Sequence, residues 1–173
     1  MNESKLDVKK RAVIEIAENL FLSQGLATTE MKEIARCASI SRSTLYRMFD
    51  SRETLAFAVA DKCLHELFDP KPMEIYGTDR SGFEILRSYS SNLIETMIQG
   101  VRYVKYLSEF DQMFSGDYPD TPEARKYVQF NRQRHDRQIL LNILRLGTED
   151  GSIRGDIDAN MLELTIGNTL LGL

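Results

Sequence analysis

Cysteine and histidine are scarce in this sequence, and tryptophan is absent. Its 173 residues include two cysteines, Cys37 and Cys63, and two histidines, His65 and His135. Two cysteines cannot build a disulfide framework, and neither residue type has the spacing of metal ligands. We therefore expect no metal site, and we predict that both cysteines are small buried apolar side chains.

Long apolar runs are lacking too. No stretch approaches the roughly 20 apolar residues of a membrane helix, and the N-terminus "MNESKLDVKKRA" has no apolar run before a cleavage site. We therefore expect a cytoplasmic protein without a membrane partner. Hydrophobic residues make up 42% of the chain, which is ample for the core of one full domain or two small ones.

The motifs of the common enzyme classes are missing as well. There is no Gly-rich phosphate loop, no nucleophile elbow and no histidine paired with a plausible nucleophile. We expect no catalytic residues and no cofactor, and the sequence argues against an enzyme.

A positive net charge, common in nucleic-acid-binding proteins, is absent, because the formal net charge is −4. The charge is uneven along the chain, however. Residues 1–55 hold nine Lys or Arg against eight Asp or Glu, whereas the remainder holds thirteen against eighteen. This asymmetry favours the N-terminal part as any DNA-facing end, and a few well-placed cations are sufficient for DNA binding.

The apolar spacing predicts an all-α fold. The pattern indicates a first helix over 8–24, a short second helix that Thr29 can cap, and a third helix after Ser41. A fourth helix, at about 51–68, opens at Asp50-Ser51 with Glu53 placed as its capping-box partner. The second and third helices are separated only by "ASIS", which is typical of a helix-turn-helix.

Beyond this segment, prolines and glycines in 69–82 predict a boundary between two domains. We expect further helices over 83–98 and 101–114, a long helical segment over 123–146, and a last helix from Ala159. The chain ends on the apolar run "MLELTIGNTLLGL" without a stop signal, so we expect a helix or its partner to continue beyond Leu173.

The expected third helix is unusually polar. In "SISRSTLYRMF", residues 39–49, four apolar residues alternate with hydroxyls and two arginines. An unpaired polar group costs roughly 1–3 kcal/mol when it is buried. These polar groups must therefore face water or a polar partner, while the apolar residues hold the helix to its domain.

One segment of about 45 residues follows a known pattern in register and without gaps. The matching residues are Ala17, Leu20-Phe21, Gly25, Thr29, Ile34-Ala35, Ser41, Thr44-Leu45-Tyr46, Phe49 and Arg52-Glu53. On these residues, the segment from Arg11 to Leu55 resembles the DNA-binding domain of tetracycline-repressor-like (TetR-family) transcriptional regulators.

The resemblance implies a function and a set of DNA contacts. It implies a helix-turn-helix DNA-binding domain over 1–55 and a helical effector-binding and dimerisation domain over 69–173. The implied protein is a homodimeric repressor that a small-molecule effector releases from an inverted-repeat operator in double-stranded DNA. The expected DNA-contacting residues are Thr29, Lys32, Arg42, Ser43, Thr44, Tyr46, Arg47 and Arg52.

The chain also departs from the family pattern at three positions. Glu30 stands where the second of two threonines usually falls, and it would place a carboxylate near a phosphate. Ser39 and Ser43 stand where glycine or another small residue is usual, so Ser39 is expected to adopt a left-handed backbone conformation at some cost.

The resemblance implies a ligand pocket and a dimer interface in the C-terminal part. Plain core packing is the alternative for each pocket residue, because aromatic and methionine stripes at helical spacing usually form cores. For the interface we expect Gly167 and Leu171 of the last helix. The candidate pocket residues are Phe83, Tyr89, Leu93, Met97, Tyr103, Tyr106, Phe110, Met113 and Phe114.

An alternative function stays open at this point. The same helix-turn-helix could serve a ligand-independent architectural DNA-binding or protein-interaction module. Sequence-independent, salt-dependent DNA binding would favour that alternative over regulation of a particular operator.

Overall fold

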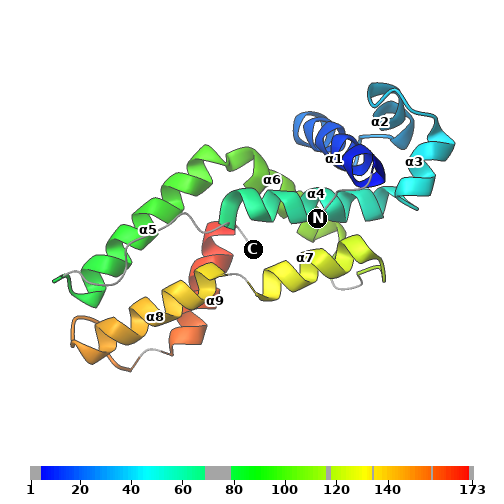
Figure 1. The fold of residues 1–173 in the computed structure, drawn as a ribbon. Coiled ribbons are helices and arrows are strands. Elements are labelled where there is room, and N and C mark those ends of the chain that lie inside the picture. The colour runs from blue at the N-terminus through cyan, green and yellow to red at the C-terminus, as the bar shows by residue number, and fades with distance from the viewer. Residues whose placement is uncertain (1–4, 69–78, 116–117, 134, 157, 172–173) are drawn as a thin grey trace. The chain divides into compact units, whose positions relative to one another are not determined.

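The computed structural model describes residues 5–68, 79–115, 118–133, 135–156 and 158–171, without the side chains at 135–137, 167–168 and 170–171. Every regular element in these ranges is an α-helix, which confirms the expected all-α fold (Figure 1). None of the described helices is long and apolar enough to cross a bilayer. The helices are α1 Lys5–Gln24, α2 Met31–Cys37, α3 Arg42–Met48, α4 Arg52–Phe68, α5 Gly82–Gln99, α6 Val101–Met113, α7 Pro122–Arg132, α8 His135–Glu149 and α9 Ala159–Leu171.

The chain divides into two compact units that do not follow a single cut in the sequence. The first unit comprises Met1–Leu64 and Lys105–Arg132, and the second comprises His65–Val104 and Gln133–Leu173. Helices α4 and α6 each contribute to both units. Most of the proline- and glycine-rich stretch that we expected as a boundary, residues 69–78, lies outside the described residues.

The first unit contains the expected helix-turn-helix. A Schellman motif ends α2: the Ser39 N–H donates to Arg36 O at 3.1 Å, and the Ile40 N–H donates to Ala35 O at 3.0 Å. This motif needs a left-handed residue after the C-cap, and Ser39 fills that position with φ 52°. The expected left-handed conformation of Ser39 is confirmed.

An aromatic cluster fills the core of the first unit. The Phe57 ring of α4 meets Phe110 of α6 edge-on, with ring centroids 4.8 Å apart, and it meets Tyr127 of α7 in the same manner at 5.6 Å. Tyr106 stacks with Phe21 of α1 and donates its hydroxyl to Ala56 O at 3.0 Å. Side chains of α6 and α7 therefore share one core with the N-terminal helices.

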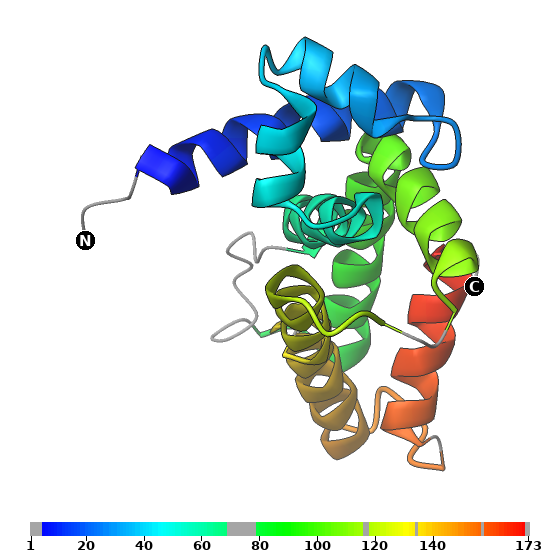
Figure 2. The same ribbon diagram turned by 90° about the vertical axis from the view of Figure 1, so that its right-hand side faces the viewer.

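The second unit is built on the close approach of α5 and α8. A Cβ placed on Gly82 would lie 2.2 Å from the Cα of Gly147, so the two backbones nearly touch. Ser81 and Glu84 form a capping box at the start of α5, and the Gly82 N–H donates to Asp150 Oδ2 at 2.6 Å. Figure 2 shows α8 and α9 side by side, and α9 packs on the core that α5 and α8 form.

Several local predictions were wrong. Glu30, not Thr29, is the N-cap of α2. At the start of α4 the hydroxyl of Ser51, not Asp50, accepts from the Thr54 N–H, so Glu53 is at the second helical position and cannot complete a capping box. Cys37 is exposed at the end of α2, whereas Cys63 is buried as expected. The expected helical segment over 123–146 is present and comprises two helices, α7 and α8.

Candidate DNA-binding surface

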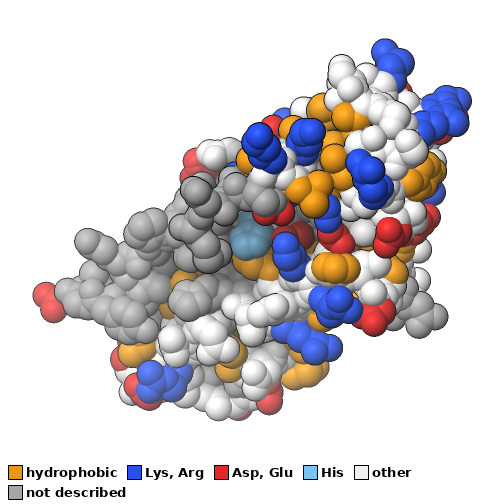
Figure 3. Space-filling model, turned by 45° about the vertical axis from the view of Figure 1, so that its right-hand side comes forward, with side chains coloured by type: hydrophobic (Ala, Val, Ile, Leu, Met, Phe, Trp, Pro, Cys, Tyr) orange, Lys and Arg blue, Asp and Glu red, His pale blue; other side chains and the backbone are white. Residues whose placement is uncertain are grey.

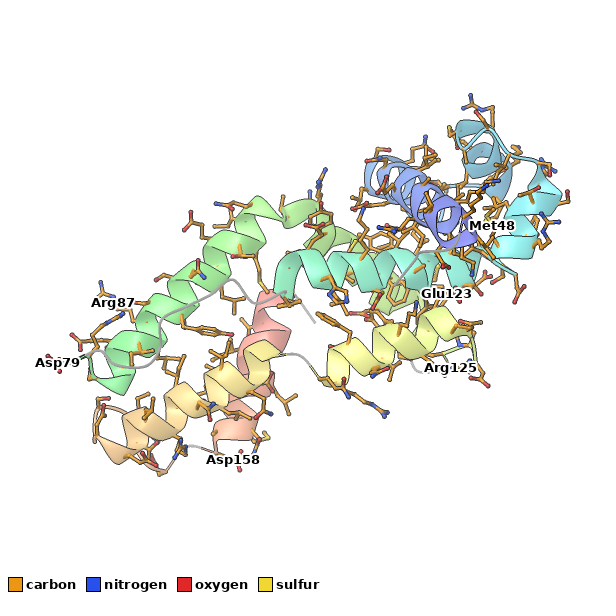
Figure 4. All side chains as sticks on the ribbon, in the orientation of Figure 1. Met48, Asp79, Arg87, Glu123, Arg125 and Asp158 are labelled. Atoms are coloured by element: carbon orange, nitrogen blue, oxygen red, sulfur yellow. The ribbon has the colours of Figure 1, made fainter. Side chains whose placement is uncertain are left out.

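Helix α3 separates its polar residues from its apolar ones. Leu45 and Met48 are buried, and Figure 4 labels Met48 on this helix. The helix exposes Arg42, Ser43, Tyr46 and Arg47, while Thr44 is half-buried. Helix α3 therefore has a row of exposed hydrogen-bonding side chains, and its buried apolar residues attach it to the domain.

The hydroxyl of Ser41 organises the start of α3. Its Oγ accepts from the Thr44 N–H at 3.1 Å, which confirms the expected N-cap. The same oxygen lies 2.9 Å from Ser43 Oγ and 2.8 Å from Thr44 Oγ1. The hydroxyl of Ser41 therefore contacts the hydroxyls of both Ser43 and Thr44 at the start of α3.

A cleft of about 480 Å³ lies where α2, α3 and the start of α4 converge. It contains three cationic side chains and two carboxylates, so its charges nearly balance. Its lining residues are Thr29, Glu30, Met31, Lys32, Arg42, Tyr46, Ser51, Arg52 and Glu53.

The two carboxylates of the cleft have different partners. The Lys32 ammonium lies 2.7 Å from Glu30 Oε2, and this hydrogen bond lowers the pKa of Glu30, with further help from the charges of Lys32 and Arg42. Hydrogen bonds from its own backbone N–H and from the Ser51 hydroxyl lower the pKa of Glu53. Sequence reasoning missed the Glu30–Lys32 pair, since it spans a helix start rather than one helix face.

Arg52 is positioned by the loop between α1 and α2. Its Nη1 donates to Ala27 O at 3.1 Å, and the Ala27 N–H donates to Glu109 Oε1 of α6 at 3.0 Å. Sequence reasoning did not find Glu109, because 82 residues separate it from Ala27 and no local pattern marks it.

Thr29 does not belong to the exposed surface. Its side chain is fully buried, and its hydroxyl donates to Gly25 O at 2.8 Å. The prediction of a DNA contact through this side chain was therefore wrong: the threonine ties the loop after α1 to the core.

Cations on the visible face stand singly rather than in one continuous patch. Figure 3 shows separate Lys and Arg side chains protruding from the upper part of this face, with acidic side chains among them.

One N-terminal cation, Lys10, already has partners within the first unit. Its Nζ lies 3.4 Å from Glu123 of α7, labelled in Figure 4, and 5.3 Å from the centroid of the Phe49 ring.

The expected ligand-binding residues are divided between the two units. Tyr106 and Phe110 belong to the aromatic core of the first unit, and Tyr89 is buried in the core of the second with Leu93 packed against it. Met97 is buried, Tyr103 and Phe114 are half-buried, and Phe83 and Met113 are exposed. Packing explains the buried members, and their ligand role stays a prediction.

Two further expectations concern the end of the chain and metals. Only the backbone is described at Gly167 and Leu171, so their role in a dimer stays a prediction. Within the described ranges, no three His, Cys, Asp or Glu side chains lie close enough together to hold a metal ion.

The sequence of the helix-turn-helix matches a known family. Residues 13–59 fit the model of bacterial regulatory proteins of the tetR family. The chain is 28% identical over 157 residues to the HTH-type transcriptional repressor KstR2 of Rhodococcus jostii strain RHA1. The matched residues cover 88% of this chain and 72% of that repressor.

Solved structures share the fold over nearly the whole chain. The ketosteroid transcriptional regulator KstR2 of Mycobacterium tuberculosis matches with a TM-score of 0.58 and 21% identity, over 99% of this chain and 82% of that one. The regulator FadR of Bacillus subtilis, solved with stearoyl-CoA, matches with a TM-score of 0.62 and 15% identity, over 94% and 83%. The match at residues 13–59 therefore identifies the helix-turn-helix of this chain as one of the tetR family of bacterial regulatory proteins.

Proposed function

We propose that this protein is a sequence-specific DNA-binding transcriptional repressor. One observation carries the proposal: α3 exposes Arg42, Ser43, Tyr46 and Arg47 on one side and buries Leu45 and Met48 on the other. A helix with this division can enter a major groove and keep its attachment to the domain. The relatives that are named as repressors support the direction of regulation.

The side chains divide into two kinds of contact. Arg42, Ser43 and Arg47 have the donors and acceptors that read base edges, and an arginine can pair bidentately with guanine. Thr44 and Tyr46 of α3, Lys32 of α2 and Arg52 of α4 hold phosphates, which fix the register of the helix without reading sequence.

The remainder of the chain regulates DNA binding in this proposal. We assign DNA binding to residues 1–55, connection to the helix at about 51–68, and effector binding and dimerisation to residues 69–173. Two copies of α3 would enter successive major grooves of an inverted-repeat operator. An effector that binds the DNA-incompetent geometry more tightly would shift the population and release the operator. The stearoyl-CoA held by a protein of this fold supports a small-molecule effector.

The test first identifies an operator by selecting the DNA duplexes that the wild-type chain binds. Duplexes enriched from a random-sequence library by the wild-type chain are compared with a mixed-sequence duplex of equal length. We expect Arg42→Ala to weaken binding to the enriched duplex about ten- to hundredfold, since a bidentate arginine–guanine pair contributes about 1–3 kcal/mol of discrimination. Tyr46→Phe should weaken both duplexes several-fold, because it removes a phosphate contact.

Arg145→Ala is the charge-matched control. Arg145 is exposed on α8 and pairs with Glu149 at 3.1 Å, so its loss removes the same charge outside residues 1–55. Unchanged affinity and specificity in both Arg42→Ala and Tyr46→Phe would refute the assignment of α3 as the reading helix. Equal affinity of the wild-type chain for every duplex would instead favour the architectural module.

A further inference from the structure

Glu30 is a helix N-cap whose side chain does not cap its helix. Its backbone has the extended conformation of an N-cap, φ −98° and ψ 144°, but the carboxylate makes no hydrogen bond to the backbone of α2. It lies instead against the ammonium of Lys32, 2.7 Å away. The usual reason for a polar residue at this position is therefore missing.

Stability does not explain the pair either. The side chain of Glu30 is 61% exposed and that of Lys32 is 57% exposed. Ion pairs this exposed contribute little to folding, because water screens them and two long side chains lose freedom. The effect of this ion pair must therefore fall on a ligand that binds in the cleft.

The surroundings of the pair consist of the proposed DNA contacts. Glu30, Lys32, Arg42 and Arg52 line the same cleft, and Tyr46 lies beside them. A phosphate that approaches Lys32 must either replace the carboxylate or bind next to it. In the first case one ion pair is exchanged for another, and in the second a like charge repels the phosphate.

We propose that Glu30 restrains the affinity of this protein for DNA by occupying the ammonium of Lys32. The restraint acts on phosphate binding, so it lowers affinity for all sequences alike and leaves base preference unchanged. A regulator with weaker non-specific binding spends less time on the many competing sites of a genome. This inference rests on the proposed function, because it assigns Lys32 and its cleft to DNA.

The test is the substitution Glu30→Gln, measured on the enriched duplex and on the mixed-sequence duplex over a series of KCl concentrations. We expect tighter binding by a similar several-fold factor on both duplexes. The slope of log affinity against log salt should steepen by up to about 0.9, the value for one more neutralised phosphate.

Glu33→Gln is the matched control. Glu33 lies on the same short helix, carries the same charge and accepts from Gln24 Nε2 at 3.2 Å, but it does not line the cleft. Its substitution should leave affinity and salt dependence nearly unchanged. A gain as large as that of Glu30→Gln would reduce the effect to net charge and overturn the inference.

A double-mutant cycle with Lys32→Gln tests the route of the effect. If Glu30 acts through the ammonium of Lys32, most of the gain from Glu30→Gln should disappear in the Lys32→Gln background. A gain that persists in full would contradict the proposed route.

The remaining outcomes separate the two proposals. Unchanged affinity in Glu30→Gln, or a loss confined to one base pair of the operator, overturns the restraint, since the second result would mean that the carboxylate reads a base. A wild-type chain that binds all duplexes equally overturns the proposed function alone, because Glu30→Gln is still measurable on the mixed-sequence duplex. A wild-type chain that binds no DNA overturns both.

Discussion

At the scale of single residues, Ser39 has the most unusual backbone of the helix-turn-helix. It is the non-glycine residue with positive φ among the described residues, and its N–H helps to close the Schellman motif after α2. Its conformation was predictable, because the family pattern has a glycine there. The burial of Thr29 was not predictable, since a threonine before a helix reads equally well as a cap; its hydroxyl instead finds a carbonyl four residues back.

The substitution Ser39→Gly should raise the free energy of unfolding by about 0.5–1 kcal/mol. A left-handed residue with a Cβ costs about 1–2 kcal/mol, and the greater freedom of glycine in the unfolded chain offsets part of that cost. Chemical denaturation of the two proteins measures the difference. Ser43→Gly, inside α3, should lower stability by about the same amount; a loss in both variants would show that Ser39 is not strained.

At the scale of elements, apolar spacing located the helices but not their pairing. The start of α5 at Gly82 followed from the predicted segment 83–98, and the end of α2 followed from the short turn. The contact of α5 with α8 joins positions about 65 residues apart through Gly82 and Gly147. Two isolated glycines give no local sign that their backbones meet, so periodicity alone cannot reveal the contact.

The substitution Gly82→Ala tests this contact. The new Cβ would lie 2.2 Å from backbone atoms of Gly147, which cannot rotate away, so we expect a loss of about 2–3 kcal/mol or a failure to fold. Thermal unfolding compares it with Gly155→Ala, whose Cβ would meet only Thr148 Cγ2 at 3.4 Å and should be tolerated. Equal stability of both variants would contradict the close approach of the helices.

At the scale of the whole molecule, α9 presents an apolar face that the described chain does not cover. Leu162 and Ile166 pack against the core of the second unit, whereas Met161 is 64% exposed and Leu164 is 45% exposed. A single helix that packs on one side and remains apolar on the other is typical of an interface with a second copy. This placement supports the proposed homodimer.

The double substitution Met161→Glu and Leu164→Glu should therefore convert a dimer into a monomer. Sedimentation of the wild-type and variant chains measures the change, with Val8→Glu, at an exposed apolar residue of α1, as control. The variant should lose most of its affinity for an inverted repeat but keep its affinity for a single half-site. A wild-type chain that sediments as a monomer, or a variant that remains a dimer, would contradict this role of α9.

The backbone N–H and C=O of Ala27 form hydrogen bonds to side chains of opposite charge. Its N–H donates to the carboxylate of Glu109, and its carbonyl accepts from the guanidinium of Arg52, which we assign to a phosphate. Ala27 has no functional side chain, so no substitution of it by another small residue would disturb this arrangement. The residue that links α6 to the proposed phosphate contact is thus invisible to alanine scanning, and the exchange of its amide proton with solvent would report the link directly.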